Sequence, residues 1–152
     1  MSLKMSARMS AKEAYKKLAG MELRSKNFMP IFEKTRLMLQ AANAENFGSS
    51  GLPVGGWSPL SPTYGAWKAI NFPGAPPMVR TGRLFKSLVD LRGPENSVRS
   101  TSATFGTDVE YAKFHQYGTT KMPKRKIVFE PAGFAIKASE DMAAWVAHGE
   151  VL

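Results

Sequence analysis

Cysteine is absent from the 152 residues, and histidine occurs only twice, as His115 and His148. The absence of cysteine excludes disulfides, thiolate metal ligands and cysteine nucleophiles. Two histidines are too few for most zinc sites. The sequence also contains no HExxH motif, Walker-type glycine loop, nucleophile elbow or calcium-loop spacing. We therefore expect no enzyme activity, and neither a metal nor a cofactor.

Long apolar runs are also missing. No stretch of about 18 apolar residues occurs, so we expect no membrane-spanning segment. The amino terminus lacks an apolar stretch of the secretory type, and we therefore expect synthesis in the cytosol. Hydrophobic residues make up 43% of the chain, which suffices for one modest core.

Acidic residues are scarce relative to basic ones. Twelve Asp and Glu face 21 Lys and Arg, which gives a net charge of +9. Residues 1–36 hold nine of the basic residues and only three Glu, so this quarter is the most basic part of the chain. Such a charge favours contact with nucleic acid, a membrane surface or an acidic protein. A solvated helix face accounts for the amino-terminal charges equally well.

Helical signals lie at both ends of the chain. We interpret residues 1–10 as a disordered basic tail and residues 11–152 as one domain. Ser10 and Glu13 have the spacing of a capping box, which predicts a helix from Ala11. An apolar stripe continues this helix, whole or broken, to about Ala44. A similar stripe after Pro131 predicts a carboxy-terminal helix.

The middle of the chain predicts less regular structure. Residues 43–80 are rich in Gly, Pro and Ser and indicate a long extended loop. Residues 88–92 and 98–107 have the pattern of a hairpin, residues 126–129 that of a short strand, and Thr81 and Asp108 could cap short helices. Gly118 would end the second of these helices. The predicted class is α+β, a small antiparallel sheet flanked by the long amino-terminal and the carboxy-terminal helices.

Two groups of residues are candidates for contact with other molecules. Trp57, Tyr64 and Trp67 lie in the predicted loop, where a neighbouring subunit could cover them, since such rings are enriched at interfaces. The alternative is that they fold back onto their own core. The second group is a basic cluster that could bind a polyanion or an acidic partner. The alternative is that it is a solvent-exposed turn with no binding role. It comprises Lys121, Lys124, Arg125 and Lys126.

His115 is the one histidine beside candidate carboxylates. It lies four residues after Tyr111 on the same face of the predicted helix, which favours a packing role. A hydrolase that uses His115 with Asp108 or Glu110 is a weaker hypothesis. Those two carboxylates are two residues apart, so on a helix they point in different directions.

Short motifs follow one another in a recognisable order from about Trp57 to Phe129. They are WSPLSPTY at 57–64, WK at 67–68, TGRL at 81–84 with Ser87, FGT at 105–107, YA at 111–112, HQYG at 115–118 and MPKR at 122–125. In this order and spacing they resemble the phage virion-morphogenesis family. The members of that family are tail-completion, minor tail or head-tail joining proteins.

The resemblance implies a virion subunit that assembles as a homo-oligomeric ring at the neck or tail. Its partners would be further copies of itself and other neck or tail proteins, and it would reside in the host cytoplasm during assembly. The subunit-interface candidates are Trp57, Leu60, Tyr64, Trp67 and Arg83. The alternative function is that of a small basic DNA-binding protein with nonspecific DNA contacts.

Overall fold

The computed structural model describes residues 10–151, so the predicted tail, apart from Ser10, lies outside the described residues. The elements are α1 (Ala11–Ser25), α2 (Met29–Gly48), the 3-10 turn η1 (Leu52–Val54), α3 (Pro62–Asn71), α4 (Arg83–Asp90), β1 (Ser97–Val98), β2 (Ala103–Thr104), α5 (Ala112–Tyr117) and α6 (Phe134–His148).

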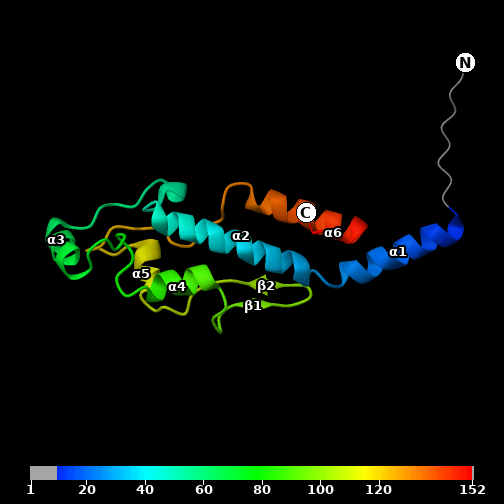
Figure 1. The fold of residues 1–152 in the computed structure, drawn as a ribbon, viewed down its shortest axis with the longest axis horizontal. Helices are drawn as coiled ribbons and strands as arrows, with labels where there is room; N and C mark the ends of the chain where they lie inside the picture. Colours follow the sequence, from blue (N-terminus) through cyan, green and yellow to red (C-terminus); the bar gives the residue numbers. More distant parts are fainter. Residues whose placement is uncertain (1–9, 152) are drawn as a thin grey trace, which may run out of the picture.

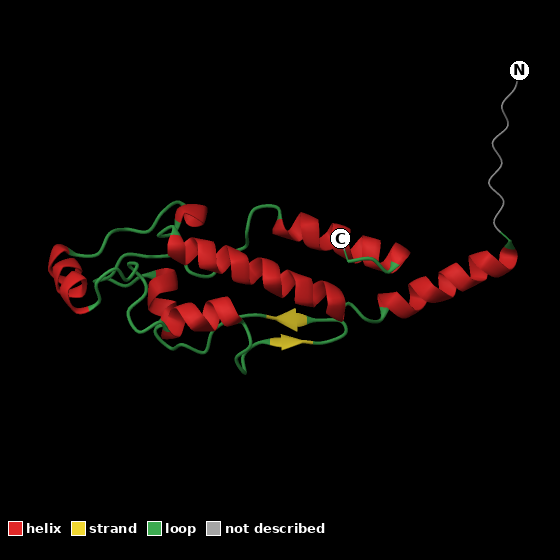
Figure 2. Cartoon of the chain, viewed as in Figure 1, coloured by secondary structure: helices red, strands yellow, loops and turns green. Residues whose placement is uncertain are grey.

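The predicted α+β class is wrong, because the described chain is essentially all helical (Figure 2). The only sheet within residues 10–151 is a hairpin of two residue pairs, Ser97 with Thr104 and Val98 with Ala103. Its turn lies at residues 99–102, inside the segment predicted as the second strand. The strand predicted at 88–92 fails because Leu84 and Leu88 lie one helical turn apart in α4 and are buried together.

The strand predicted at residues 126–129 is also absent, and a side chain takes the place of its partner. The Gln116 carbonyl Oε1 accepts hydrogen bonds from the backbone N–H groups of Ile127 and Val128, both at 2.9 Å. The Gln116 amide Nε2 donates to the Val128 carbonyl at 2.9 Å. This segment therefore meets its backbone hydrogen-bonding needs against α5 without a sheet.

The long loop predicted at residues 43–80 is interrupted by regular structure. Helix α2 continues to Gly48, and α3 occupies Pro62–Asn71. Ser61 caps α3 by accepting a hydrogen bond from the Tyr64 N–H, and Pro62 occupies the first turn. A polar cap followed by proline is a helix-start signal that explains why this apparent loop is helical.

Several helix ends follow the sequence. The capping box of Ser10 and Glu13 starts α1, Gly118 ends α5, and the carboxy-terminal helix is present as α6. The predicted amino-terminal helix is the broken form, α1 and α2, with Pro30 in the first turn of α2. The predicted caps Thr81 and Asp108 are wrong, since Gly82 and Tyr111 occupy the cap positions without a side-chain hydrogen bond.

Helix α2 forms the axis of an elongated molecule (Figure 1). Helix α4 packs along one side of it and α6 along the other, while α3 and α1 lie at opposite ends. The hydrophobic core lies where α2 ends. Its buried residues are Phe47, Leu84, Leu88, Val109, Ala112 and Ile127. Close packing there gives the α3 end of the molecule a rigid base.

Hydrogen bonds to backbone carbonyls join α1 to α6. Arg24 of α1 donates to the Val146 and Ala147 carbonyls of α6 at 2.9 and 3.2 Å. The Trp145 indole N–H donates to the Asn27 carbonyl at 2.8 Å. Helix α1 itself buries no residue. None of the helices in residues 10–151 is long and apolar enough to cross a membrane.

Candidate interaction site

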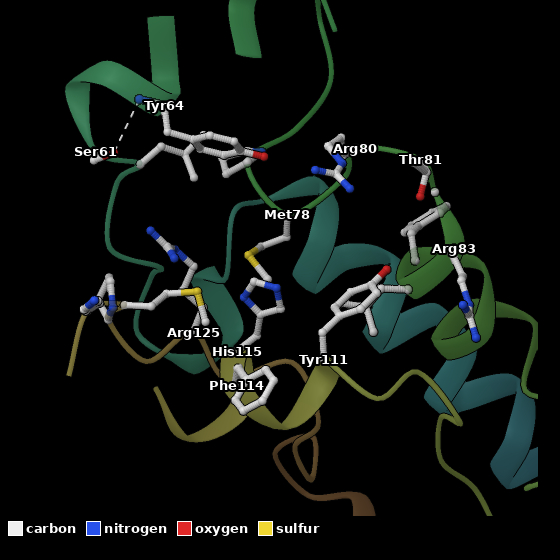
Figure 3. A pocket seen from close by; sticks show the side chains of 18 residues that line it. Ser61, Tyr64, Met78, Arg80, Thr81, Arg83, Tyr111, Phe114, His115 and Arg125 are labelled. Carbon is white, nitrogen blue, oxygen red and sulfur yellow. Dashed lines mark hydrogen bonds between the residues drawn. The ribbon is translucent and has the colours of Figure 1, made fainter. Parts of the chain in front are cut away.

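A cavity of about 520 Å³ lies between α3, the start of α4 and α5 (Figure 3). We call it the α3–α5 cavity. Tyr64 reaches it from α3, while Tyr111 and His115 reach it from the start and middle of α5. Its volume is typical of sites that take a small ligand or part of a partner chain. Segments far apart in sequence therefore meet at one concave surface.

Arg125 joins two sides of this cavity. Its side chain is only 4% exposed, and it donates from Nε to the Ser58 carbonyl at 2.9 Å and from Nη2 to the Pro59 carbonyl at 2.8 Å. Its backbone N–H donates to the His115 carbonyl at 2.8 Å. Burial lowers the pKa of the Arg125 guanidinium, which remains charged at neutral pH. Arg125 thus anchors the chain that enters α3 to the chain that leaves α5.

Trp57 also joins the chain before α3 to the segment after α5, and it packs against the core. Its ring meets that of Phe47 edge-on, with centroids 5.3 Å apart, and its indole N–H donates to the Lys126 carbonyl at 2.9 Å. The indole lies over Gly51, where a Cβ would come within 2.4 Å of the ring. Gly51 also has a φ of 86°, so glycine is required there on both counts.

Lys68 fixes α3 to the loop that follows it. The side chain is 3% exposed, and its Nζ donates to the carbonyls of Ala75 and Pro77 at 3.3 and 3.0 Å and also to that of Pro76. Three acceptors satisfy the three N–H groups of an ammonium. Burial lowers the pKa of Lys68. This lysine therefore has a structural role that the sequence pattern did not reveal.

His115 lies inside the cavity in an unfavourable place for a positive charge. Burial lowers its pKa, and the nearby charge of Arg125 lowers it further, so the imidazole is neutral at pH 7. The ring meets that of Tyr111 edge-on. Within residues 10–151, no hydrogen bond or ion pair joins His115 to Asp108 or Glu110. The geometry offers a polar wall rather than a histidine–carboxylate pair.

The charged side chains that line the cavity are all basic. Arg80, Arg83 and Lys121 are exposed, and Arg125 is buried. No Asp or Glu is among the lining residues. Asp108, outside the cavity, lies 4.0 Å from Arg83, and both side chains are more than half exposed. Solvent screens an exposed pair at this distance, so the cavity is positive.

The structure brings five of the nine predicted contact residues to this cavity. Leu60, Tyr64, Arg83, Lys121 and Arg125 line it. The other four lie outside its lining. Trp57 packs against the core, Trp67 stacks on Tyr64 with centroids 5.5 Å apart, and Lys124 and Lys126 are exposed nearby.

Sequence reasoning missed four of the lining residues that matter most here: Met78, Arg80, Phe114 and Met122. Phe114 and Met122 stand inside or beside the recognised motif blocks, which was the available signal. Met78 and Arg80 follow a Pro-rich turn and carry no local signal of their own.

No group of side chains suited to hold a metal ion occurs in the part of the chain that the structure describes. Comparison with known proteins adds no relative, because no family model, curated protein or solved structure matches the chain.

Proposed function

We propose that this chain is a structural subunit of a bacteriophage virion that acts in tail completion or head-tail joining as a homo-oligomeric ring. It would contact further copies of itself and other neck or tail proteins, in the host cytoplasm during assembly and in the finished particle afterwards. One observation carries the assembly part of this proposal. Exposed apolar side chains lie at the two opposite ends of the elongated molecule.

The first of these surfaces is on α1. Tyr15 and Leu18 are three residues apart, on one face of the helix, and are 76% and 63% exposed. Helix α1 buries no residue of its own. An amphipathic helix of this length draws most of its stability from packing of its apolar face. A neighbouring subunit would supply the missing packing.

The second surface is on α3. Tyr64 and Trp67 are stacked and remain 38% and 42% exposed, and Ile70, a further three residues on, is 80% exposed. Side chains at this spacing share one side of the helix. Exposed tyrosine and tryptophan beside an aliphatic residue are typical of protein interfaces. This surface includes two of the subunit-interface candidates.

Surfaces at opposite ends favour head-to-tail contact between copies. A contact between two different surfaces generates a ring if the rotation closes and a filament if it does not. In Figure 1, α1 and α3 lie at the far ends of the long axis. A ring is therefore the closed assembly that this arrangement supports.

The resemblance to the virion-morphogenesis family gains support from how its motif blocks are joined. Arg125 from the last block binds the carbonyls of Ser58 and Pro59 in the first, and Ser87 shares a 2.7 Å hydrogen bond with Thr107. Two pairs of blocks are thus joined directly, the first with the last and the TGRL block with the FGT block.

The test is the solution mass of the full chain, measured by light scattering over a range of concentrations and paired with negative-stain images. We expect discrete particles of several subunits that appear as rings. A monomer at every concentration, or open filaments without rings, would contradict the proposal.

DNA binding is the second candidate, and one observation favours it. Lys121, Lys124 and Lys126 are exposed within six residues of one another and form no ion pair within residues 10–151. Binding through phosphate contacts should weaken steeply as salt concentration rises. A titration with a fluorescent duplex tests this, and no binding at low salt would remove the candidate.

A further inference from the structure

The α3–α5 cavity combines an apolar lining with exposed cations. The apolar side chains that line it are Leu60, Met78, Leu84, Phe85, Phe114 and Met122, of which Phe114 is itself 46% exposed. Methionine side chains adapt to the shape of what they bind and are common at binding surfaces. Tyr64 and Tyr111 add two hydroxyl groups to the wall. The cavity can therefore bury apolar side chains and hydrogen-bond a chain that crosses it.

The exposed cations that line the cavity lack strong internal partners. Arg80 and Lys121 make no ion pair within residues 10–151, and Arg83 has only the 4.0 Å approach to Asp108. Like charges gathered at a concave surface raise the local concentration of anions. The charge pattern therefore selects an acidic ligand.

We propose that this cavity binds a peptide segment of another protein in which acidic side chains alternate with apolar ones. The apolar side chains pack against the apolar lining, and the carboxylates pair with Arg80, Arg83 and Lys121. Such a site goes beyond ring formation, because it recruits a different protein and does not require the ring.

The form of the cavity favours a peptide over DNA. Nonspecific DNA binding relies on cations that reach phosphates from an open surface. Here the cations surround a cavity lined in part by Leu60, Met78 and Met122. Phosphates and sugars would not fill this apolar cavity. Arginine, methionine and aromatic residues together are the composition of a protein interface.

A second copy of this chain is a poor occupant. Glu140 and Asp141 are the only adjacent carboxylates in the sequence. Asp141 is 1% exposed, with its two oxygens 2.7 Å from Lys34 Nζ and 3.1 Å from Lys137 Nζ. The only carboxylates separated by one apolar residue are Asp108 and Glu110. Val109 between them is 3% exposed in the core, and Tyr111 after them lines this same cavity. A second copy therefore cannot present this segment without unfolding, and charge complementarity assigns the site to a different protein.

The cavity is held in shape before a ligand binds. Arg125 fixes the chain entering α3, and Lys68 fixes the loop leaving it, each through backbone carbonyls and with its side chain buried. A site formed in advance loses less conformational entropy on binding. Binding should therefore leave the backbone of α3 and α5 where it is.

The experiment is fluorescence anisotropy with the full chain and a short labelled peptide in which glutamates alternate with leucine and phenylalanine. We expect saturable binding that weakens at least about tenfold when glutamine replaces glutamate, or when serine replaces the apolar residues, each tenfold being about 1.4 kcal/mol. Equal binding of the glutamine peptide would overturn the proposal.

Two charge-reversal variants locate the site. Arg80→Glu with Lys121→Glu should weaken binding at least about tenfold, whereas Lys12→Glu with Lys17→Glu on α1 makes the same change in net charge and should weaken it less than about threefold. All four side chains are exposed, so both variants should fold, which thermal unfolding checks. If both variants weakened peptide binding equally, binding would depend only on the net charge of the protein, and the proposal would be overturned.

A labelled DNA duplex completes the test. If it binds more tightly than the peptide and the cavity variant abolishes that binding, the cavity is a DNA site and the proposal fails. Because Tyr64 belongs both to the cavity wall and to the exposed α3 surface, peptide binding is measured at concentrations below those at which the chain assembles, and the ring is judged separately by solution mass.

Discussion

The two ends of the molecule are stabilised by different interactions. At the α3 end, Phe47, Leu88 and Ile127 are at most 2% exposed and form part of one close-packed core. At the other end, α1 buries no residue, and the only buried residue of α6 is Asp141. A clustered apolar core thus organises the α3 end. At the other end Ile31, 0% exposed at the start of α2, is an isolated buried apolar side chain, and α1 is joined to α6 by hydrogen bonds to backbone carbonyls.

The two ends would therefore contribute to assembly in different ways. The cored end can hold a cavity in shape, because close-packed side chains resist displacement. The polar end fixes the direction of α1 through Arg24 and Trp145 while leaving Tyr15 and Leu18 exposed. We interpret α1 as an arm whose apolar face a neighbour completes. Changes at the two ends should therefore have different consequences.

The largest effect should come from the core. Phe47→Ala would remove a ring that contacts both Trp57 and Phe85 edge-on and would leave a cavity. We expect a loss of about 3–5 kcal/mol in the free energy of unfolding. Urea denaturation followed by tryptophan fluorescence measures it. A loss below about 1 kcal/mol would mean that the α3 end is not organised by this core.

A smaller loss should follow at the polar end. Asp141→Ala leaves Lys34 and Lys137 without the carboxylate that lies between them. Breaking a fully buried pair costs about 3–5 kcal/mol, and because both lysines are partly exposed we expect about 2 kcal/mol. Glu140→Ala on the exposed side of α6 is the matched control. Equal effects of the two changes would contradict the role of Asp141.

The link between α1 and α6 should be weaker still. Arg24→Ala removes two hydrogen bonds to the last-turn carbonyls of α6, which otherwise lack helical partners. We expect about 1 kcal/mol of destabilisation. Amide hydrogen exchange should quicken at the end of α6 but not in α4, and Lys17→Ala, exposed on α1, should leave both unchanged.

Acid should also affect the polar end through Asp141. Burial raises the pKa of this carboxyl, but the hydrogen bonds and charges of Lys34 and Lys137 lower it more, so its pKa in the folded state is below the ordinary value. The stability it contributes is complete above the unfolded pKa of about 3.9 and is lost as the pH falls through the folded pKa. The difference in urea midpoint between the native chain and Asp141→Asn should therefore shrink below about pH 4 and stay constant above about pH 5.

The sequence predicted the helices at both ends of the chain and the short helices α4 and α5, but not α3 or the full length of α4. Ser10 with Glu13 and the stripe after Pro131 are local signals, and local hydrogen bonds and helical periodicity decide those elements. In the middle, the sequence pattern places Leu84 in a predicted short helix and Leu88 in a predicted strand. Burial against α2, which depends on residues far away in sequence, resolved that ambiguity.

The candidate site was partly predictable for a similar reason. The motif series pointed to Tyr64, Arg83 and Arg125, which do meet at one cavity. It could not show that Arg125 is buried on the Ser58 and Pro59 carbonyls, because a run of basic residues in sequence looks the same whether it is exposed or buried. Buried Lys68 and the strand-replacing Gln116 likewise depend on tertiary contacts.

The most direct test of the central claim, that α1 is completed by a neighbouring copy, compares two leucine variants by light scattering. Leu18 on α1 and Leu52 in η1 are 63% and 72% exposed, so Leu→Ser removes the same side chain from two similarly exposed positions. Burying a leucine is worth about 1.5–3 kcal/mol, so Leu18→Ser should raise the concentration needed for assembly at least about tenfold, while Leu52→Ser should leave it unchanged. Identical masses for both variants at every concentration would contradict the claim.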